Sequence, residues 1–153
     1  MNFFFDANIS ERISNMLAAY CEDKHAIIHI RQHEDFSHNN TDFGNNTPDV
    51  EYIDKLRQSN KHWNIISGDS GIIDTPHERA ALLASGLTFF CLDHNWSKAR
   101  VSEQAWKIVK IWSEIETAAK TQGQALYRVH MGKRMRVEPI RSGMRARGGP
   151  LRG

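Results

Sequence analysis

The chain is poor in the features that mark secreted, membrane and thiol-based proteins. Its 153 residues include two cysteines, Cys21 and Cys91, and no Cys-x-x-Cys pair, which excludes a zinc ribbon and a thioredoxin-type motif. No apolar run approaches the ~20 residues that a membrane span needs, and the start, Met-Asn-Phe-Phe-Phe-Asp, is not that of a signal peptide. A Gly-Lys-Ser/Thr sequence is also missing, which excludes a nucleotide P-loop. We expect a cytoplasmic protein with two buried free thiols and no membrane contact.

Charge is spread unevenly along an otherwise ordinary composition. Hydrophobic residues make up 40% and charged residues 25%, as in one soluble globular domain. Residues 1–132 hold 13 Lys/Arg and 17 Asp/Glu, whereas residues 133–153 hold seven Lys/Arg and one Glu. We therefore divide the chain into a domain, residues 1–131, and a basic, flexible tail, residues 132–153. Such a tail either meets nucleic acid or an acidic partner, or is a solvated extension.

Hydrophobic patterning predicts strands that alternate with helices. The strands are short apolar runs, and the helices show apolar residues at a spacing of three to four. The expected strands cover residues 3–5, 26–30, 63–67, 87–92 and 125–131, and the expected helices cover residues 9–22, 47–59, 75–85 and 99–120. A long polar loop is expected at 32–47. This order predicts a single α/β domain, a three-layer arrangement in which helices flank a parallel sheet on both faces.

Three aspartates stand at strand ends and a helix start. Asp6 and Asp69 each follow an apolar strand, and Asp49 opens a helix after Thr-Pro. In a parallel α/β fold these positions gather at the carboxyl edge of the sheet, where ligands bind. Converging carboxylates repel one another unless a cation lies between them. The pattern therefore predicts a site for a hard metal ion, Mg or Mn.

Several polar residues beside these acids have two interpretations. Asn8 and Ser10 either orient a metal-bound water or cap the following helix, and Ser67 either donates to a carboxylate or belongs to a plain turn. The acids Glu51 and Asp74 are either further ligands or helix-end residues favoured by the dipole and by capping. Two of the eight histidines, His25 and His29, are interpreted as surface or loop residues; His33 and His38, in the polar loop, are candidate auxiliary ligands.

Together these segments resemble a known family. Asp6-x-Asn8-x-Ser10, then Thr-Pro-Asp49-Val-Glu, then Ile-Ser-Gly-Asp69 occur in the order seen in PIN-like domains, relatives of the VapC-type ribonuclease toxins. The helix that begins Pro-His-Glu-Arg-Ala-Ala-Leu and the strand Gly-Leu-Thr-Phe-Phe are similar as well. The resemblance covers roughly residues 2–115 and depends on the ordered spacing.

The resemblance implies a metal-dependent endoribonuclease, often the toxin of a toxin–antitoxin pair. It assigns Asp6, Asp49 and Asp69 to the acidic site with Mg or Mn. Gly71 stands where the family usually has a further acid, so Asp74 or Glu51 would have to supply the fourth ligand. The implied partners are an RNA substrate and a cognate antitoxin protein, and a homo-oligomer is left open.

Basic side chains are needed to hold the RNA backbone. The candidates are Arg12, Arg31, Arg100, Lys133, Arg134 and Arg136. A competing hypothesis keeps the fold without the catalysis: a module that binds nucleic acid or protein, in which the acids are remnants and the basic tail binds.

Overall fold

The computed structural model describes residues 1–22, 24–32 and 49–141, with the backbone alone at positions 49 and 50. His33, His38 and nearly all of the expected polar loop lie outside the described residues, as does the tail from residue 142 on.

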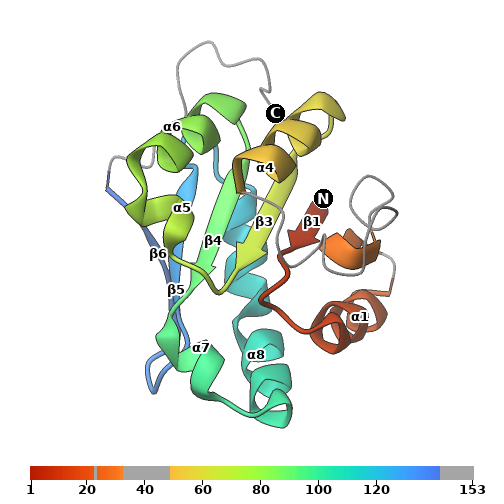
Figure 1. Ribbon diagram of the computed structural model, residues 1–153. Coiled ribbons are helices and arrows are strands. Elements are labelled where there is room, and N and C mark those ends of the chain that lie inside the picture. Colours follow the sequence, from red (N-terminus) through yellow and green to blue (C-terminus); the bar gives the residue numbers. More distant parts are fainter. Residues whose placement is uncertain (23, 33–48, 142–153) are drawn as a thin grey trace.

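The elements follow the predicted alternation of strands and helices (Figure 1). The strands are β1 (Asn2–Phe5), β2 (Ala26–His29), β3 (Trp63–Ser67), β4 (Thr88–Leu92), β5 (Leu126–His130) and β6 (Arg136–Pro139). The helices are α1 (Glu11–Tyr20), α4 (Asp49–Gln58), α5 (Gly71–Asp74), α6 (Pro76–Ser85), α7 (His94–Lys98) and α8 (Val101–Ala119), with a 3-10 turn, η1, at Ile30–Gln32. The predicted α/β class is confirmed.

The sheet has the order β2-β1-β3-β4-β5-β6. Strands β1 to β5 are parallel, and β6 is antiparallel to β5. The chain moves outward in one direction from β1 to β2 and in the other from β3 to β5, so the strand order reverses between β1 and β3. At such a switch point the connections leave on opposite faces and open a crevice at the carboxyl edge.

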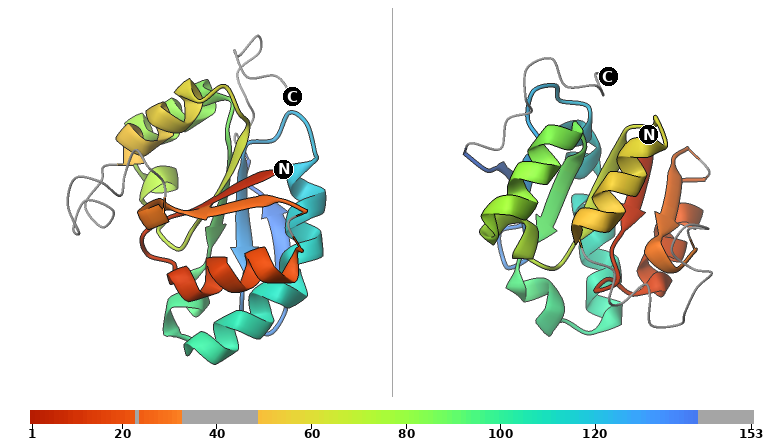
Figure 2. Two further views of the ribbon diagram at one scale, coloured as in Figure 1. Left: turned by 90° about the vertical axis from the view of Figure 1, so that its right-hand side faces the viewer. Right: turned by 45° about the horizontal axis from the view of Figure 1, so that its top comes forward.

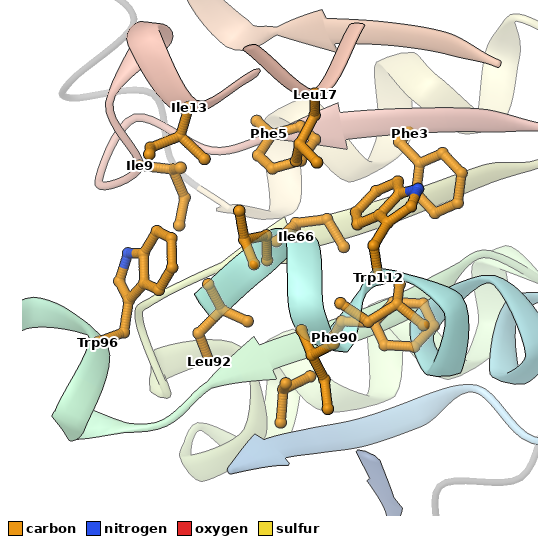
Figure 3. Close-up of a cluster of buried hydrophobic side chains, with 14 of the residues drawn as sticks. Phe3, Phe5, Ile9, Ile13, Leu17, Ile66, Phe90, Leu92, Trp96 and Trp112 are labelled. Carbon is orange, nitrogen blue, oxygen red and sulfur yellow. The ribbon is translucent and has the colours of Figure 1, made fainter. Parts of the chain in front are cut away.

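Helices cover both faces of the sheet and bury two apolar clusters (Figure 2). On one face α1 and α8 pack against the sheet, and Phe3, Phe5 and Trp112 fill the space between them (Figure 3). On the other face α4, α5 and α6 pack over Phe4 and Phe89. The β1 side chains therefore alternate between the two clusters, as the period of two in a strand requires. Phe3, Phe4 and Phe5 are all fully buried, as expected for a strand covered on both faces.

The structure differs from the prediction after β5. The sequence from Gly132 on was expected to form no regular structure, yet Arg136–Pro139 pairs with β5 as strand β6. An edge strand is half solvated, so its polar residues hide the alternation: Val137 packs against the core while Arg136 and Glu138 are exposed. The short helices α5 and α7 were also missed, because four or five residues carry too little periodicity.

The prediction of a surface or loop position is wrong for His29, whereas His25 does lie in the loop before β2. His29 is buried, and its Nε2 lies 2.6 Å from the carbonyl oxygen of Ile9. The His25 side chain is also largely covered and pairs with Glu116 of α8. His29 thus links β2 to the connection before α1, and His25 links the loop before β2 to α8. Sequence alternation alone does not show such partners.

Candidate functional site

The ends of β1 and β3 bring Asp6, Ser67 and Asp69 together at the switch point. Phe5 pairs with Ile66, and the Asp6 amide continues the ladder by donating to the Ile66 carbonyl at 3.0 Å. The strands thus end side by side, and the two connections that follow them contain Asp6 and Asp69. The carboxyl-edge location predicted for these two aspartates is confirmed.

The Ser67 hydroxyl links the two connections. It donates to Oδ2 of Asp6 at 2.9 Å, and it accepts from Nδ2 of Asn8 at 3.2 Å and from the Asp69 amide at 3.1 Å. A hydroxyl has one proton to donate and two acceptor positions, so Ser67 uses all three. Its single proton is directed at Asp6.

Of Asn8 and Ser10, only Ser10 has the predicted capping role, and Asn8 makes a contact that was not predicted. Asn8 accepts from the Gly68 amide through Oδ1 at 2.8 Å while its Nδ2 donates to Ser67, so its side chain crosses to the β3 connection instead of capping α1. Ser10 is the N-cap of α1 and accepts from the Arg12 amide at 3.2 Å. Asn8 therefore fixes the loop geometry of the switch point, and Ser10 fixes the helix that follows it.

Asp6 is a buried acid whose ionised form is disfavoured by its surroundings. The side chain is 8% exposed, and burial raises the pKa of its carboxyl. Hydrogen bonds from the Ala7 amide and the Ser67 hydroxyl lower this pKa, as does the nearby Tyr52 side chain, while the charge of Asp69 raises it. Burial and the neighbouring carboxylate both raise the pKa of Asp6, and a cation bound beside it would lower this pKa.

Asp69 is exposed and held by the turn that leads into α5. Its Oδ1 accepts from the Gly71 amide at 2.9 Å. A Cβ atom at position 71 would lie 3.3 Å from that oxygen, so glycine at position 71 permits this close turn.

Burial raises the pKa of the Cys91 thiol to about 11, and the charges of Asp69, Asp74 and Asp93 add to the rise. The positive charge of Arg128 acts in the opposite direction.

The first turn of α4 reaches the same edge through Tyr52. This side chain is fully buried, stacks on Phe4 with ring centroids 5.4 Å apart, and acts on the pKa of Asp6. Asp49 begins α4 three residues earlier, and its side chain lies outside the described part of the structure. Glu51, in the same turn, is exposed.

Comparison with known families identifies the chain. A sequence profile described as "PIN like domain" matches residues 1–94. The chain belongs to the PIN-like domain family. Comparisons with curated proteins and with solved structures gave no match. The family match spans β1 to the start of α7 and therefore includes Asp6, Asn8, Asp49, Ser67 and Asp69.

PIN-like domains are generally nucleases that bind nucleic acid and use divalent metals, so a nuclease-type fold is present here. The donor set around the switch point consists of carboxylate oxygens, which suit Mg and Mn. Among the side chains that the structure describes, no three of His, Cys, Asp and Glu come close enough to hold an ion. Asp6 and Asp69 are the two described carboxylates at the switch point, and both offer the oxygen ligands that a hard cation takes.

Sequence reasoning missed three side chains that shape this PIN-like site. Tyr52 and His29 were not assigned to it, and Trp96 of α7 packs against Gly68, where an added Cβ atom would lie 3.5 Å from the indole. His29 donates from Nε2 to Ile9 and accepts the Arg31 amide on Nδ1, which holds the β1–α1 connection. The signal in the sequence that could have identified Tyr52 and Trp96 is that each is a large aromatic residue in a short helix beside the predicted site.

The predicted cations of this PIN-like domain lie on different surfaces. All six are exposed: Arg12, Arg31, Arg100, Lys133, Arg134 and Arg136. Arg31 lies 3.9 Å from Glu11 and Arg136 lies 3.1 Å from Glu138. Arg100 is the N-cap of α8, and Lys133 and Arg134 lie between β5 and β6, so these three belong to the carboxyl edge. No helix in the described ranges is both long and apolar enough to cross a membrane.

Proposed function

We propose that this PIN-like domain is an endoribonuclease that cleaves RNA phosphodiesters with Mg or Mn. The observation that supports the proposal is Asp6: a buried carboxylate, hydrogen-bonded by Ser67, with Asp69 acting on it from the neighbouring strand end. Two acids kept close at a switch point are costly to a fold without a cation. A structural role alone would be served better by neutral side chains.

In this proposal Asp6 and Asp69 hold the metal, and Asp49 holds it or orients the attacking water. The role proposed for Asp49 is supported by its place in the sequence. Asp49 begins α4 three residues before Tyr52, and Tyr52 acts on the pKa of Asp6. Asp74 is one candidate for the missing fourth acid, and its charge, like that of Asp69, acts on the Cys91 thiol. Glu51 is the second substitute.

The ion, when bound, would polarise the phosphoryl oxygens and lower the pKa of a bound water. The chain's own groups do the positioning. Ser67 orients the Asp6 carboxylate by donating to Oδ2, and the Ala7 amide, 2.6 Å away, orients Oδ1. Asn8 holds the β1 and β3 connections at a fixed separation. Basic residues of the carboxyl edge, Arg100, Lys133 and Arg134, would contact the phosphates of single-stranded or looped RNA.

The biological role proposed for this activity is that of a toxin in a toxin–antitoxin pair. An antitoxin protein would neutralise the enzyme by directing an Arg or Lys side chain into the carboxylate site, where a charge-assisted pair replaces the cation. Growth arrest on expression, abolished by Asp6→Asn, is the expected result. Expression without any growth defect would reject the toxin role and leave the nuclease proposal intact.

The test of the nuclease proposal is cleavage of end-labelled single-stranded RNA by the full chain. Wild type should cleave with Mg or Mn and stop when EDTA is added, and Asp6→Asn should lose at least 100-fold in rate, as expected when a group that binds the catalytic ion is removed. Asp54→Asn is the matched control, since Asp54 lies on α4 and pairs with Arg57 on the exposed side. RNA binding without cleavage by the wild type would favour the non-catalytic binding module.

A further inference from the structure

The largest exposed aromatic side chain of the described structure lies outside the matched family region. Trp106 of α8 is 53% exposed, whereas Trp63, Trp96 and Trp112 are buried. Tryptophan is enriched where proteins contact their partners, since its ring offers a large apolar face and a polar N–H, so a half-exposed indole is a candidate contact site.

Two lysine ammonium groups lie next to this indole. Nζ of Lys107 is 5.8 Å and Nζ of Lys110 is 6.0 Å from the ring centroid, within the range of cation–π contacts. Lys107 is already committed, since it donates to the Met131 carbonyl at 2.8 Å and pairs with Glu103 at 3.0 Å. Lys110 is exposed, and no carboxylate of the described residues pairs with it. The Lys110 ammonium is therefore a positive charge beside the Trp106 ring that a ligand can contact.

The surroundings of Trp106 are largely polar. Its neighbours on α8 at spacings of three, four and seven residues include the exposed Ser102, Lys110 and Ser113 and the partly buried Glu103 and Val109. The other exposed large hydrophobic residues of the described structure are Met1, Tyr20 and Val101, and none of them is a neighbour at these spacings. A protein-docking surface needs a contiguous exposed apolar patch, and the described residues around Trp106 do not form one. A lone aromatic ring beside a free ammonium suits a base that stacks while its phosphate meets the cation.

The position of Trp106 connects it to the candidate nuclease edge. The first half of α8 is tied to the carboxyl ends of the strands, since Gln104 donates to the Trp96 carbonyl at 2.8 Å and Lys107 donates to Met131, the residue that follows β5. In Figure 1, α7 and the start of α8 lie at the end of the molecule toward which the strand arrows point. Lys133 and Arg134 are exposed in the turn directly after Met131.

We propose that Trp106 and Lys110 form a binding subsite for single-stranded RNA, in which one unpaired base stacks on the indole and the adjacent phosphate contacts the Lys110 ammonium. The subsite rests on the proposed function in that RNA is its ligand. It extends the binding surface from the metal edge, past Lys133 and Arg134, onto α8. Base stacking of this kind is tolerant of sequence, so the subsite contributes affinity and not base choice.

The test measures the affinity of the full chain for a fluorescein-labelled 12-nucleotide single-stranded RNA in EDTA, where metal-dependent cleavage is stopped. Trp106→Ala should weaken binding by about 5- to 150-fold, as expected when one stacked base is lost, and Trp106→Phe should recover part of it. Lys110→Gln should reduce the slope of log K against log salt by about 0.7, the value for one phosphate contact to a single strand. RNA should also quench wild-type tryptophan fluorescence, and Trp106→Ala should abolish this quenching because the other three indoles are buried.

Two controls separate stacking from charge and from surface aromaticity in general. Tyr20 is 55% exposed on α1, so Tyr20→Ala removes an equally exposed ring and should leave RNA affinity unchanged. Heparin, a polyanion without bases, should bind Trp106→Ala and wild type equally. Equal RNA affinity of Trp106→Ala and wild type, or no RNA binding by the wild type, would overturn the subsite.

Cleavage measured in parallel keeps this subsite and the nuclease proposal distinguishable. RNA binding that depends on Trp106 in a wild type that never cleaves supports the subsite and rejects the nuclease. Metal-dependent cleavage with unchanged affinity in Trp106→Ala rejects the subsite alone.

Discussion

Replacement of Ser67 by alanine should destabilise the protein by an amount that grows as pH rises. The change removes the proton that Ser67 donates to the buried Asp6 carboxylate and leaves Oδ1 bonded to the Ala7 amide. Hydrogen bonds to a charged group contribute about 1.5–3 kcal/mol. For a domain of this size that corresponds to a drop in Tm of about 3–12 °C at neutral pH.

The pH dependence distinguishes this effect from simple loss of a buried hydroxyl. The Ser67 bond lowers the pKa of Asp6, so its removal raises that pKa further. The cost should therefore be largest where wild-type Asp6 is ionised and smallest at acid pH, where Asp6 is protonated in both proteins. Ser67→Ala also removes the acceptor for Asn8 and for the Asp69 amide, and this adds a cost in the free energy of unfolding that does not vary with pH.

The assay is thermal and urea unfolding of four proteins between pH 4 and 8, without added metal: wild type, Ser67→Ala, Asp6→Asn and the double variant. A neutral amide at position 6 needs the Ser67 bond less than a carboxylate does, so Ser67→Ala should cost less in the Asp6→Asn background. The coupling energy should be about 0.5–3 kcal/mol. Additive costs that are equal at pH 4 and pH 8 would refute the assignment of the Ser67 proton to Asp6.

Three further predictions concern the same edge of the sheet. Burial lowers the pKa of His29, so as pH falls the unfolded chain takes up a proton at this ring before the folded chain does, and stability is lost below about pH 6.5. In His29→Gln, Tm should therefore fall less between pH 7 and pH 5 than in the wild type. An equal fall in Tm in the two proteins would contradict this. Burial raises the pKa of Asp6, so the ionised Asp6 carboxylate lowers stability as pH rises. Asp6→Asn should therefore raise Tm at pH 7 in EDTA, and a lower Tm would contradict the cost assigned to the ionised carboxylate. With a thiol pKa of about 11, Cys91 should not react with a disulfide reagent at pH 7 until the protein unfolds, as thiol titration can check; rapid reaction of the native protein would show that β4 is accessible.

The sheet and its acid-bearing edge were predictable because strong local patterns specify them. Continuous apolar runs at Phe3–Phe5 and Trp63–Ser67 predict buried parallel strands, and parallel strands bring Asp6 and Asp69 to one edge. The capping role of Ser10 also follows from its position before the helical spacing begins. These inferences use only neighbours in the sequence and one rule of topology.

The contacts across the switch point could not be predicted in the same way. Asn8 reaches Gly68, His29 reaches Ile9, and Trp96 packs on Gly68, and each pair is separated by twenty or more residues. Asn8 was equally suited to capping, and only the register of β1 against β3 decides which partner it meets. Strand β6 was missed for a related reason, since its pairing with β5 supplies the order that its short, mostly polar sequence does not indicate.

The central claim is that acids from β1, β3 and α4 form one site for a divalent ion. Calorimetric titration of the full chain with Mn, without RNA, tests it most directly. Asp6→Asn, Asp49→Asn and Asp69→Asn should each weaken binding at least tenfold, while Asp54→Asn, one turn or more along α4, should bind as wild type does. Binding of Mn that survives all three substitutions, or no binding by the wild type, would contradict the account.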